Sequence, residues 1–168
     1  MELTIRPERA SDASAVHTVV AAAFERDDEA KLVDALRGVA EPYIAFVAEA
    51  EGRVIGHIAF TPITLGGDGP AAMGLAPVAV EPNTQNRGVG SALVRAGLKA
   101  CAERDVGLVF VLGHAEYYPR FGFRPAFDLG FHYRSSEFDP SFFVLELSPG
   151  AAAGRSGFVR YHSAFERV

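Results

Sequence analysis

The stretch Val80–Asp105, VEPNTQNRGVGSALVRAGLKACAERD, combines a strand end, a loop rich in glycine and the start of a helix. An apolar run ends in Pro, Asn, Gln and Gly, and a pattern typical of a helix begins at once. Glycines weaken a first helical turn, because they lose more conformational entropy on folding than other residues. Bare backbone there indicates a close ligand. Unpaired N–H groups and the positive end of the helix dipole attract anions, so the stretch predicts a phosphate site.

The glycine pair alone leaves several interpretations open. A Walker A loop needs a Lys followed by Ser or Thr after its second glycine, and a dinucleotide fingerprint needs a third glycine. The segment QNRGVGSAL has neither. An ordinary helix-start turn fits the same residues, and so does a nucleotide-binding regulatory domain of another kind. A second feature is needed before the loop indicates a function.

The hydrophobic pattern predicts one domain over residues 1–168, with a single sheet of the α/β or α+β class. Ser11 is expected to cap the first helix, and Gly38 to stop the second. Apart from the helix inside the stretch quoted above, the expected strands and helices cover Leu3–Arg6, Asp12–Phe24, Glu29–Arg37, Tyr43–Ala50, Arg53–Leu65, Ala71–Val80, Val106–Gly113, Phe143–Ser148 and Val159–Tyr161. The run Val106–Gly113 is apolar throughout and is expected to be buried on both faces.

Composition and charge limit the function classes. The 168 residues are 49% hydrophobic and 22% charged, which is typical of a globular protein. A net charge of −5 without any basic run argues against binding nucleic acid through its phosphates. The start MELTIRPERA lacks the apolar run of a signal peptide or membrane span, and the lone Cys101 forms no internal disulfide. A cytoplasmic location is therefore expected.

The second feature is VLGHAEYYPRFGFRPA, Val111–Ala126, directly after the buried strand. Together with QNRGVG, Gln85–Gly90, it resembles the GNAT superfamily of acyl-CoA-dependent N-acetyltransferases, in the form of its small bacterial-type members. The loop is similar to the family's Q/R-x-x-G-x-G/A pyrophosphate motif, and Tyr118–Phe123 is similar to its Y-x-x-x-G-F segment. The resemblance covers Leu3–Leu147. It implies an α/β (α+β mixed sheet) domain, with a mostly antiparallel central sheet, splayed parallel strands and flanking helices.

The resemblance also implies a site for acetyl-CoA as the acyl donor. Backbone amides of the loop hold the pyrophosphate in such proteins, and a strand pairs its main chain with the pantetheine arm. That pairing is open because the next strand, Leu108–Leu112 here, splays away and frees a ladder position. The residues expected to contact acetyl-CoA are Val78, Val80, Gln85, Arg87, Gly88, Val89, Gly90 and Ser91.

Tyr118 is the candidate general acid. The amine attacks the thioester directly in such enzymes, so the protein must position two substrates, stabilise an oxyanion and protonate the departing thiolate. A phenol with a pKa of about 10 is protonated at neutral pH and can supply that proton. The Val78 backbone N–H is the candidate oxyanion donor. Core packing is the alternative role for Tyr118, and it is the expected role of Tyr117.

The group that takes the proton of the amine is less evident. Some relatives carry a Glu on the strand before the glycine loop, but Gly74 stands at the aligned position here. His114, at the end of the buried strand, is a candidate base, and Glu29, on the second expected helix, is a candidate acceptor-side residue. A structural hydrogen bond for His114 and plain solvation for Glu29 are the more common roles of such residues.

The favoured interpretation is transfer of an acetyl group from acetyl-CoA to a primary amine of a small molecule, peptide or protein. The alternative is a non-catalytic acyl-CoA-binding sensor or regulatory domain. The acceptor is expected between Phe24–Arg37, Phe60–Thr64 and the chain after Phe127. Cys101 shares an apolar helix face, and the histidine spacing matches no metal motif, so no metal is expected. A monomer or a homodimer fits the sequence.

Overall fold

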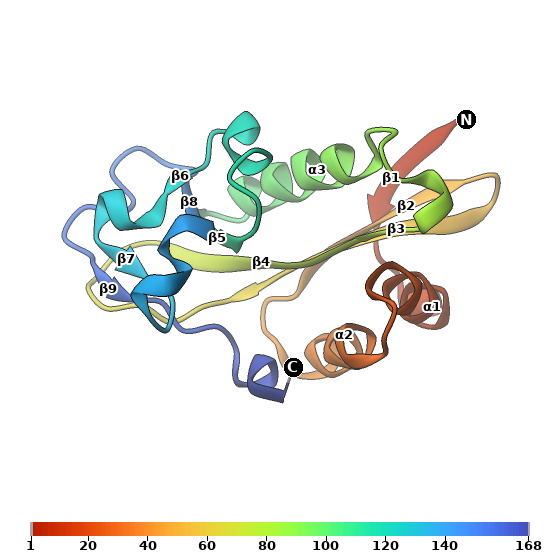
Figure 1. Cartoon of the computed structure of the whole chain (residues 1–168), viewed down its shortest axis with the longest axis horizontal. Coiled ribbons are helices and arrows are strands. Elements are labelled where there is room, and N and C mark those ends of the chain that lie inside the picture. Colours follow the sequence, from red (N-terminus) through yellow and green to blue (C-terminus); the bar gives the residue numbers. More distant parts are fainter. Residues whose placement is uncertain (1, 168) are drawn as a thin grey trace.

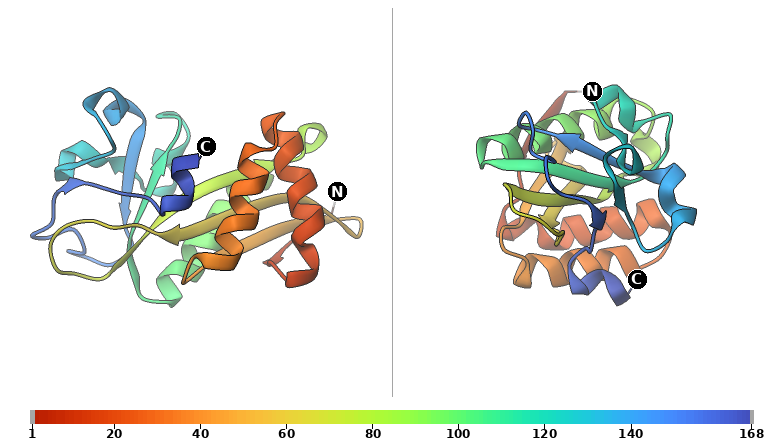
Figure 2. Two further views of the ribbon diagram at one scale, coloured as in Figure 1. Left: turned by 90° about the horizontal axis from the view of Figure 1, so that it is seen from below. Right: turned by 90° about the vertical axis from the view of Figure 1, so that its left-hand side faces the viewer.

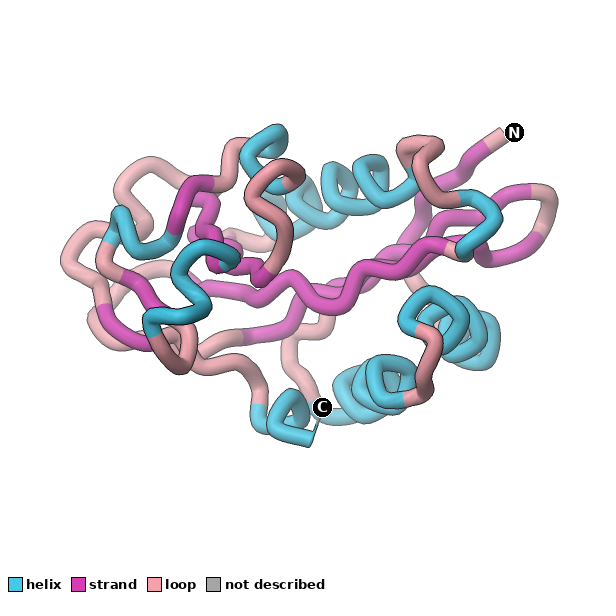
Figure 3. Tube along the Cα trace, in the orientation of Figure 1, coloured by secondary structure: helices cyan, strands magenta, loops and turns pink. Residues whose placement is uncertain are grey.

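The computed structural model describes residues 2–167. Its main sheet has seven strands in the order β1-β2-β3-β4-β5-β8-β6, and β7 and β9 form a separate two-stranded sheet. Helix α3 covers one face of the main sheet, and α1 and α2 cover the other (Figures 1 and 3). Within the main sheet only β4 and β5 run parallel among the described residues. The expected mixed fold, with a mostly antiparallel sheet between helices, is confirmed.

The strands and helices follow the hydrophobic pattern of the sequence. The strands are β1 Leu3–Pro7, β2 Ile44–Ala50, β3 Arg53–Pro62, β4 Ala71–Val80, β5 Val106–Leu112, β6 Arg124–Pro125, β7 Phe131–His132, β8 Phe142–Glu146 and β9 Gly157–Phe158. The α-helices are α1 Ala13–Phe24, α2 Asp28–Val39 and α3 Val89–Glu103. Short 3₁₀ helices cover Ala10–Asp12, Pro82–Thr84, Tyr118–Phe121, Ala126–Leu129, Ser136–Ser141 and Ser163–Arg167.

The predicted cap of the first helix is wrong. Ser11 lies inside a 3₁₀ turn, and α1 begins only at Ala13. The carboxylate of Asp12 is instead held by the Arg6 guanidinium at 2.8 Å and by the Arg9 backbone N–H at 2.7 Å. A partly buried ion pair to the first strand therefore holds Asp12 at the start of the helix, and this pairing is not visible in local sequence.

The predicted end of the second helix is also wrong. Gly38 keeps helical backbone, and α2 continues to Val39. The helix ends where Ala40 becomes extended, with its N–H capping the Leu36 carbonyl at 2.9 Å. Pro42 follows closely and favours extended backbone before it. The proline, rather than the glycine, marks the boundary.

The divergence of β4 and β5 positions the site. The two strands pair from Ala71 to Gly74, opposite Val106–Phe110, and no further, so the sheet opens into a V. The opening starts later than predicted, because the first half of Leu108–Leu112 is still paired. On its other edge β4 carries a bulge at Ala76–Pro77, where the register to β3 shifts. Proline has no N–H for the ladder, so a bulge is where a strand tolerates it.

Helix α3 lies unusually close to the sheet. A Cβ on Gly97 would be 2.1 Å from the ring of Phe60 on β3, so only glycine fits this position. On the sheet side of the same interface, a Cβ on Gly56 of β3 would lie 3.1 Å from Leu93 of α3. The close packing fixes the start of α3 beside the end of β4 (Figure 1).

The chain after β5 builds a second layer around an aromatic core. Phe110 of β5 packs edge-on against Phe131 at 5.1 Å and stacks on Phe142 at 5.5 Å. β3 ends at Pro62 rather than at the predicted Leu65, because the chain leaves the main sheet to pair Thr64 with Arg160. The C-terminal turn Ser163–Arg167 then returns to lie against α2 (Figure 2).

Candidate active site

A cleft of about 1020 Å³ occupies the gap between β4 and β5. It is lined by the second half of β4, the loop before α3, the end of β5 and the tyrosines that follow, with α1 and α2 at its side. Phe165 reaches it from the C-terminal turn. Every site residue predicted from the sequence lines this cleft except Arg87, which is exposed beside it. The structure therefore gathers Glu29, His114 and Tyr118 with the glycine loop.

The main chain of Val78 and Val80 faces the gap. The N–H of Glu81 donates to the Ile55 carbonyl at 2.8 Å, so that cross-strand pair is hydrogen-bonded. Bonded and non-bonded pairs alternate in an antiparallel ladder, so Val78 and Val80 turn their N–H and C=O groups away from β3. They point toward β5, which has already diverged. The Gln85 side-chain amide donates to the Val80 carbonyl at 3.1 Å and ties the loop to the strand.

The glycine loop presents a helix start without side chains. Gly88 has a left-handed backbone with φ of 82° immediately before α3. A Cβ there would meet nothing within 4 Å, so the backbone conformation, and not lack of space, requires the glycine. The first intrahelical bond runs from the Ala92 N–H to the Gly88 carbonyl, so the amides before it are free. No acidic side chain stands in this first turn, and its positive potential suits an anion.

Tyr118 lines the cleft from the 3₁₀ turn after β5. Only 6% of it is exposed, and burial, with a smaller effect of Tyr117, raises its pKa to about 12. Its hydroxyl is therefore protonated at neutral pH, as a proton donor must be. Gly113 makes room for the ring, because a Cβ there would lie 2.2 Å from it. Phe123 packs edge-on against it at 5.6 Å.

Tyr117 contributes more to the cleft than the sequence indicated. The Tyr117 hydroxyl oxygen lies 3.1 Å from the Ser91 Oγ. A Cβ on Gly90 would come within 3.3 Å of this Tyr117 oxygen. The Arg120 guanidinium covers its ring at 4.6 Å. The side chain thus bridges the loop of the aromatic motif and the glycine loop. Its position beside Tyr118 was the only signal, and that signal favoured a packing role.

Glu29 and His114 differ in how they are held. Glu29 is only 9% exposed and accepts a hydrogen bond from the Arg26 Nε at 2.9 Å, so it is not a freely solvated helix carboxylate. His114 is exposed, and its carbonyl accepts the backbone N–H groups of Tyr117 at 3.0 Å and Tyr118 at 3.4 Å. His114 thereby supports the turn that carries both tyrosines, and the residue also lines the cleft.

Groups for other chemistries are not gathered at the cleft. Cys101 is fully buried in the core beneath α3, as predicted, and burial raises the pKa of its thiol to about 12. Over residues 2–167 no three His, Cys, Asp or Glu side chains are placed to hold a metal ion. In the same range, no helix has both the length and the apolar character needed to cross a bilayer. The cleft offers a main-chain cradle, a protonated phenol and aromatic walls.

An elongated main-chain cradle that ends beside a protonated tyrosine suits a transferase for an activated acyl group. Comparison with known proteins agrees with this class. Residues 4–126 match the model of the acetyltransferase (GNAT) domain. The chain belongs to the GNAT family of N-acetyltransferases, and the resemblance predicted from its two motifs is confirmed.

Similar proteins extend this match to nearly the whole chain. The uncharacterized N-acetyltransferase YhbS of Escherichia coli (strain K12) is 35% identical over 166 residues, which is 98% of this chain and 99% of YhbS. The crystal structure of E. coli YhbS in complex with CoA has a TM-score of 0.92 and covers 99% of this chain and 93% of its own. A GNAT family acetyltransferase from Brucella melitensis in complex with acetyl-CoA is 36% identical, with a TM-score of 0.80 and 98% coverage of both chains.

Proposed function

We propose that this chain binds acetyl-CoA between β4 and β5 and transfers the acetyl group to a primary amine. The observation that carries the proposal is the main chain of Val78 and Val80, which faces the gap left by β5, beside a first turn of α3 that carries no acidic side chain. One part of the cleft offers peptide hydrogen bonds, and the other offers a positive helix end. The pantetheine arm and the pyrophosphate of CoA carry the matching groups. Similar proteins with CoA or acetyl-CoA in their crystals support this assignment.

The residues that line the cleft support the donor site that we propose. The amides of Gly88–Ser91 hold the pyrophosphate, and Gln85 keeps the loop in place through the Val80 carbonyl. Arg87, exposed at the rim, contributes its backbone amide and a positive charge from outside the cleft wall. A volume of about 1020 Å³ lies at the upper end of the range for small-molecule pockets, about 300–1,000 Å³, as a ligand as long as acetyl-CoA requires.

The reaction we propose is a direct displacement. The amine nitrogen attacks the thioester carbonyl carbon, the C–N bond forms, and the C–S bond then breaks. The Val78 N–H, turned into the gap, stabilises the oxyanion that forms on the carbonyl oxygen. Tyr118 gives its proton to the departing thiolate and regains one from the nitrogen through water. A well-placed general acid of this kind contributes about 10²–10⁴-fold to the rate.

The amine must lose one proton before it can attack. Gly74 supplies no carboxylate at the position where some relatives carry one. In our proposal that proton leaves to water at the open side of the cleft, with His114 as the candidate carrier. Glu29, held by Arg26 at the cleft wall, draws the cationic amine toward the site. The chain thereby separates attraction of the amine from its deprotonation.

Release of free thiol from acetyl-CoA tests the proposal, measured over a panel of amines, amino acids and peptides. Binding of acetyl-CoA and of ATP is followed separately by calorimetry. We expect acetyl-CoA to bind, ATP not to bind, and at least one amine to release thiol in step with its acetylated product. Binding without release across the panel would point to an acyl-CoA sensor, and absence of binding would refute the proposal. The cytoplasmic location and the oligomeric state stay predictions.

A further inference from the structure

A second cavity, of about 600 Å³, lies in the C-terminal layer. Four aromatic side chains contribute to its walls, namely Tyr133, Phe158, Tyr161 and Phe165. Phe165 also lines the cleft between β4 and β5, so one side chain borders both spaces. Phe158 leaves 64% of its surface exposed, an apolar wall that a bound molecule would cover. The second cavity is therefore adjacent to the cleft between β4 and β5, the proposed donor cleft, and has its own apolar walls.

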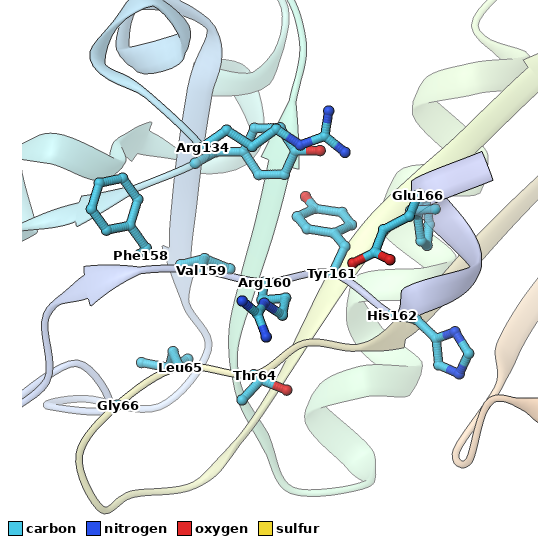
Figure 4. Close-up of a pocket in the computed structure, with 12 residues that line it drawn as sticks. Thr64, Leu65, Gly66, Arg134, Phe158, Val159, Arg160, Tyr161, His162 and Glu166 are labelled. Atoms are coloured by element: carbon cyan, nitrogen blue, oxygen red, sulfur yellow. The ribbon is translucent and has the colours of Figure 1, made fainter. Parts of the chain in front are cut away.

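Tyr161 connects this cavity to the point where the sheet splits. A Cβ on Gly74 would lie 2.6 Å from the Tyr161 ring, so the ring stands directly over that glycine. Gly74 is the last residue of β4 that pairs with β5. Any side chain at position 74 would fill this same space. In the present chain a phenol from the C-terminal segment occupies it, and Figure 4 shows that side chain between Arg134 and Arg160.

The Tyr161 hydroxyl has no hydrogen-bond partner among the described residues, although only 8% of the residue is exposed. An orphaned buried hydroxyl is unfavourable. The Thr61 Oγ1 is orphaned as well, and Thr61 stands opposite Gly74 in the ladder. Burial raises the pKa of Tyr161, with Tyr133 and Tyr118 as smaller causes, so its hydroxyl is protonated.

The charges around the cavity are of two kinds. Arg134 and Arg160 line it, both are exposed, and neither forms an ion pair with the described residues. Arg134 is held over the Tyr133 ring at 5.1 Å. Glu166, on the C-terminal turn, is the single carboxylate in the described lining (Figure 4). Two guanidinium groups and one carboxylate thus surround aromatic walls.

We propose that this cavity is the acceptor site and that the acceptor is a small molecule carrying both a primary amine and a carboxylate. The proposal rests on the proposed acetyl transfer and adds the class of acceptor. Arg134 and Arg160 bind the carboxylate, because guanidinium groups match its two oxygens. Glu166 attracts the ammonium end, and the Tyr161 ring forms the wall beside the split of the sheet. The aromatic walls cover the carbon skeleton between the two ends.

Matched pairs of acceptors test this assignment. L-phenylalanine is compared with 2-phenylethylamine, and 4-aminobutanoate with butylamine, so that each pair differs in the carboxylate. We expect a higher kcat/KM for the carboxylate member in at least one pair. Arg134→Gln and Arg160→Gln should each raise the KM of that member about tenfold, the loss of a charge-assisted hydrogen bond, and change that of its partner by less than about twofold.

Arg124→Gln is the matched control, because Arg124 is an exposed arginine on β6 that lines neither cavity. It should leave both KM values unchanged, and the Kd of acetyl-CoA should be the same in all three variants. Saturation-transfer NMR of the preferred acceptor on the CoA-saturated protein should show weaker acceptor binding in the Arg134 and Arg160 variants than in the wild type. Thiol release with amines or peptides that neither variant alters would overturn the acceptor assignment and leave acetyl transfer intact. Absence of thiol release with every acceptor would overturn both.

Discussion

The donor cleft and the second cavity are built by different means, although Phe165 borders both. The donor cleft uses main-chain groups of β4 and of one loop, Val78–Ser91, which follow one another in the chain. The second cavity uses side chains from separate segments, such as Arg134, Arg160 and Glu166. A site made of backbone needs particular glycines at fixed spacing, and it leaves a motif in the sequence. A site made of side chains from distant segments leaves none.

The two sites should respond differently to mutation. Donor residues should act through backbone conformation, so small changes at glycines should reduce binding of acetyl-CoA. Residues of the second cavity should act through charge and shape, and should change the acceptor alone. Tyr118 belongs to neither group, because it is proposed to act on the bond that breaks between the two substrates.

The largest effect is expected for Tyr118→Phe. Loss of the hydroxyl removes the proposed proton donor, and kcat should fall about 10²–10⁴-fold. The ring remains packed against Gly113 and Phe123, so the Kd of acetyl-CoA and the melting temperature should change little. Steady-state thiol release and calorimetry measure the two quantities. Turnover at the wild-type level would remove Tyr118 from the mechanism. Tyr117→Phe, which loses only the 3.1 Å contact to Ser91, is the matched comparison and should keep most of the turnover.

A smaller effect is expected for Gly88→Ala, which tests the donor cleft. The left-handed backbone at φ 82° strains an alanine by about 1–2 kcal/mol and turns the first amides of α3. Losing one or two charge-assisted hydrogen bonds should weaken acetyl-CoA binding about 10–100-fold. Gly52→Ala is the control, because Gly52 has φ of 75° and open space around its Cβ, in the turn between β2 and β3. We expect both variants to lose the same stability, and only Gly88→Ala to lose affinity for acetyl-CoA. Equal acetyl-CoA affinities of the two variants would show that the phosphates bind elsewhere.

A third effect, confined to the acceptor, is expected for Gly74→Ala. The new methyl group would lie 2.6 Å from the Tyr161 ring and displace it from the split of the sheet. We expect kcat/KM for the acceptor to fall about tenfold, at a stability cost of about 1–3 kcal/mol for overpacking. The Kd of acetyl-CoA should stay unchanged. Gly56→Ala overpacks the other face of the sheet, against Leu93, and should lower stability without changing the acceptor KM. A parallel loss of acetyl-CoA binding in Gly74→Ala would contradict separate sites.

The fold was largely predictable because its strands are apolar runs bounded by turn residues. β4 and the turn before β3 agree with the predicted bounds, and β5 differs by one residue at its end. The errors lie where distant residues decide. Ser11 does not cap the first helix as predicted, and Asp12, at the start of that helix, is bound by Arg6 of the first strand. Similarly, β3 stops early because Thr64 pairs with Arg160, far along the chain.

The candidate site divides in the same way. That the glycine loop and Tyr118 line one cleft could be predicted, because their two motifs carry the resemblance; their roles stay predictions. Tyr161 could not, since nothing in the sequence links it to Gly74 before the C-terminal segment folds back over β4. His57 illustrates the same limit: its side chain is fully buried and contacts Glu8, a residue from the other end of the N-terminal half. Contacts between remote side chains are set by the fold and have no local signature.

Glu8 lines neither the donor cleft nor the second cavity, and it tests the comparison from outside. Its carboxylate accepts hydrogen bonds at 2.7 Å from His57 and 2.9 Å from Arg37, and its side chain is 5% exposed. Burial alone would raise its pKa, but His57 and then Arg37 outweigh burial and lower the pKa to about 2. The unfolded value is 4.5. The stabilisation is thus complete above about pH 4.5 and is lost as the pH falls toward 2.

The smallest effect on turnover is therefore expected for Glu8→Gln. At pH 7 the change should lower the free energy of unfolding by about 2 kcal/mol, after allowance for solvent screening, and at pH 3 by clearly less. Urea unfolding at a series of pH values measures this difference, and the acid side of the profile should flatten. Below the unfolding transition, kcat and the Kd of acetyl-CoA should stay at wild-type values, because neither cavity loses a wall. A stability loss of the same size at both pH values would show that Glu8 acts through packing instead of charge. A change in acetyl-CoA affinity would mean that the donor cleft depends on side chains well outside its own backbone.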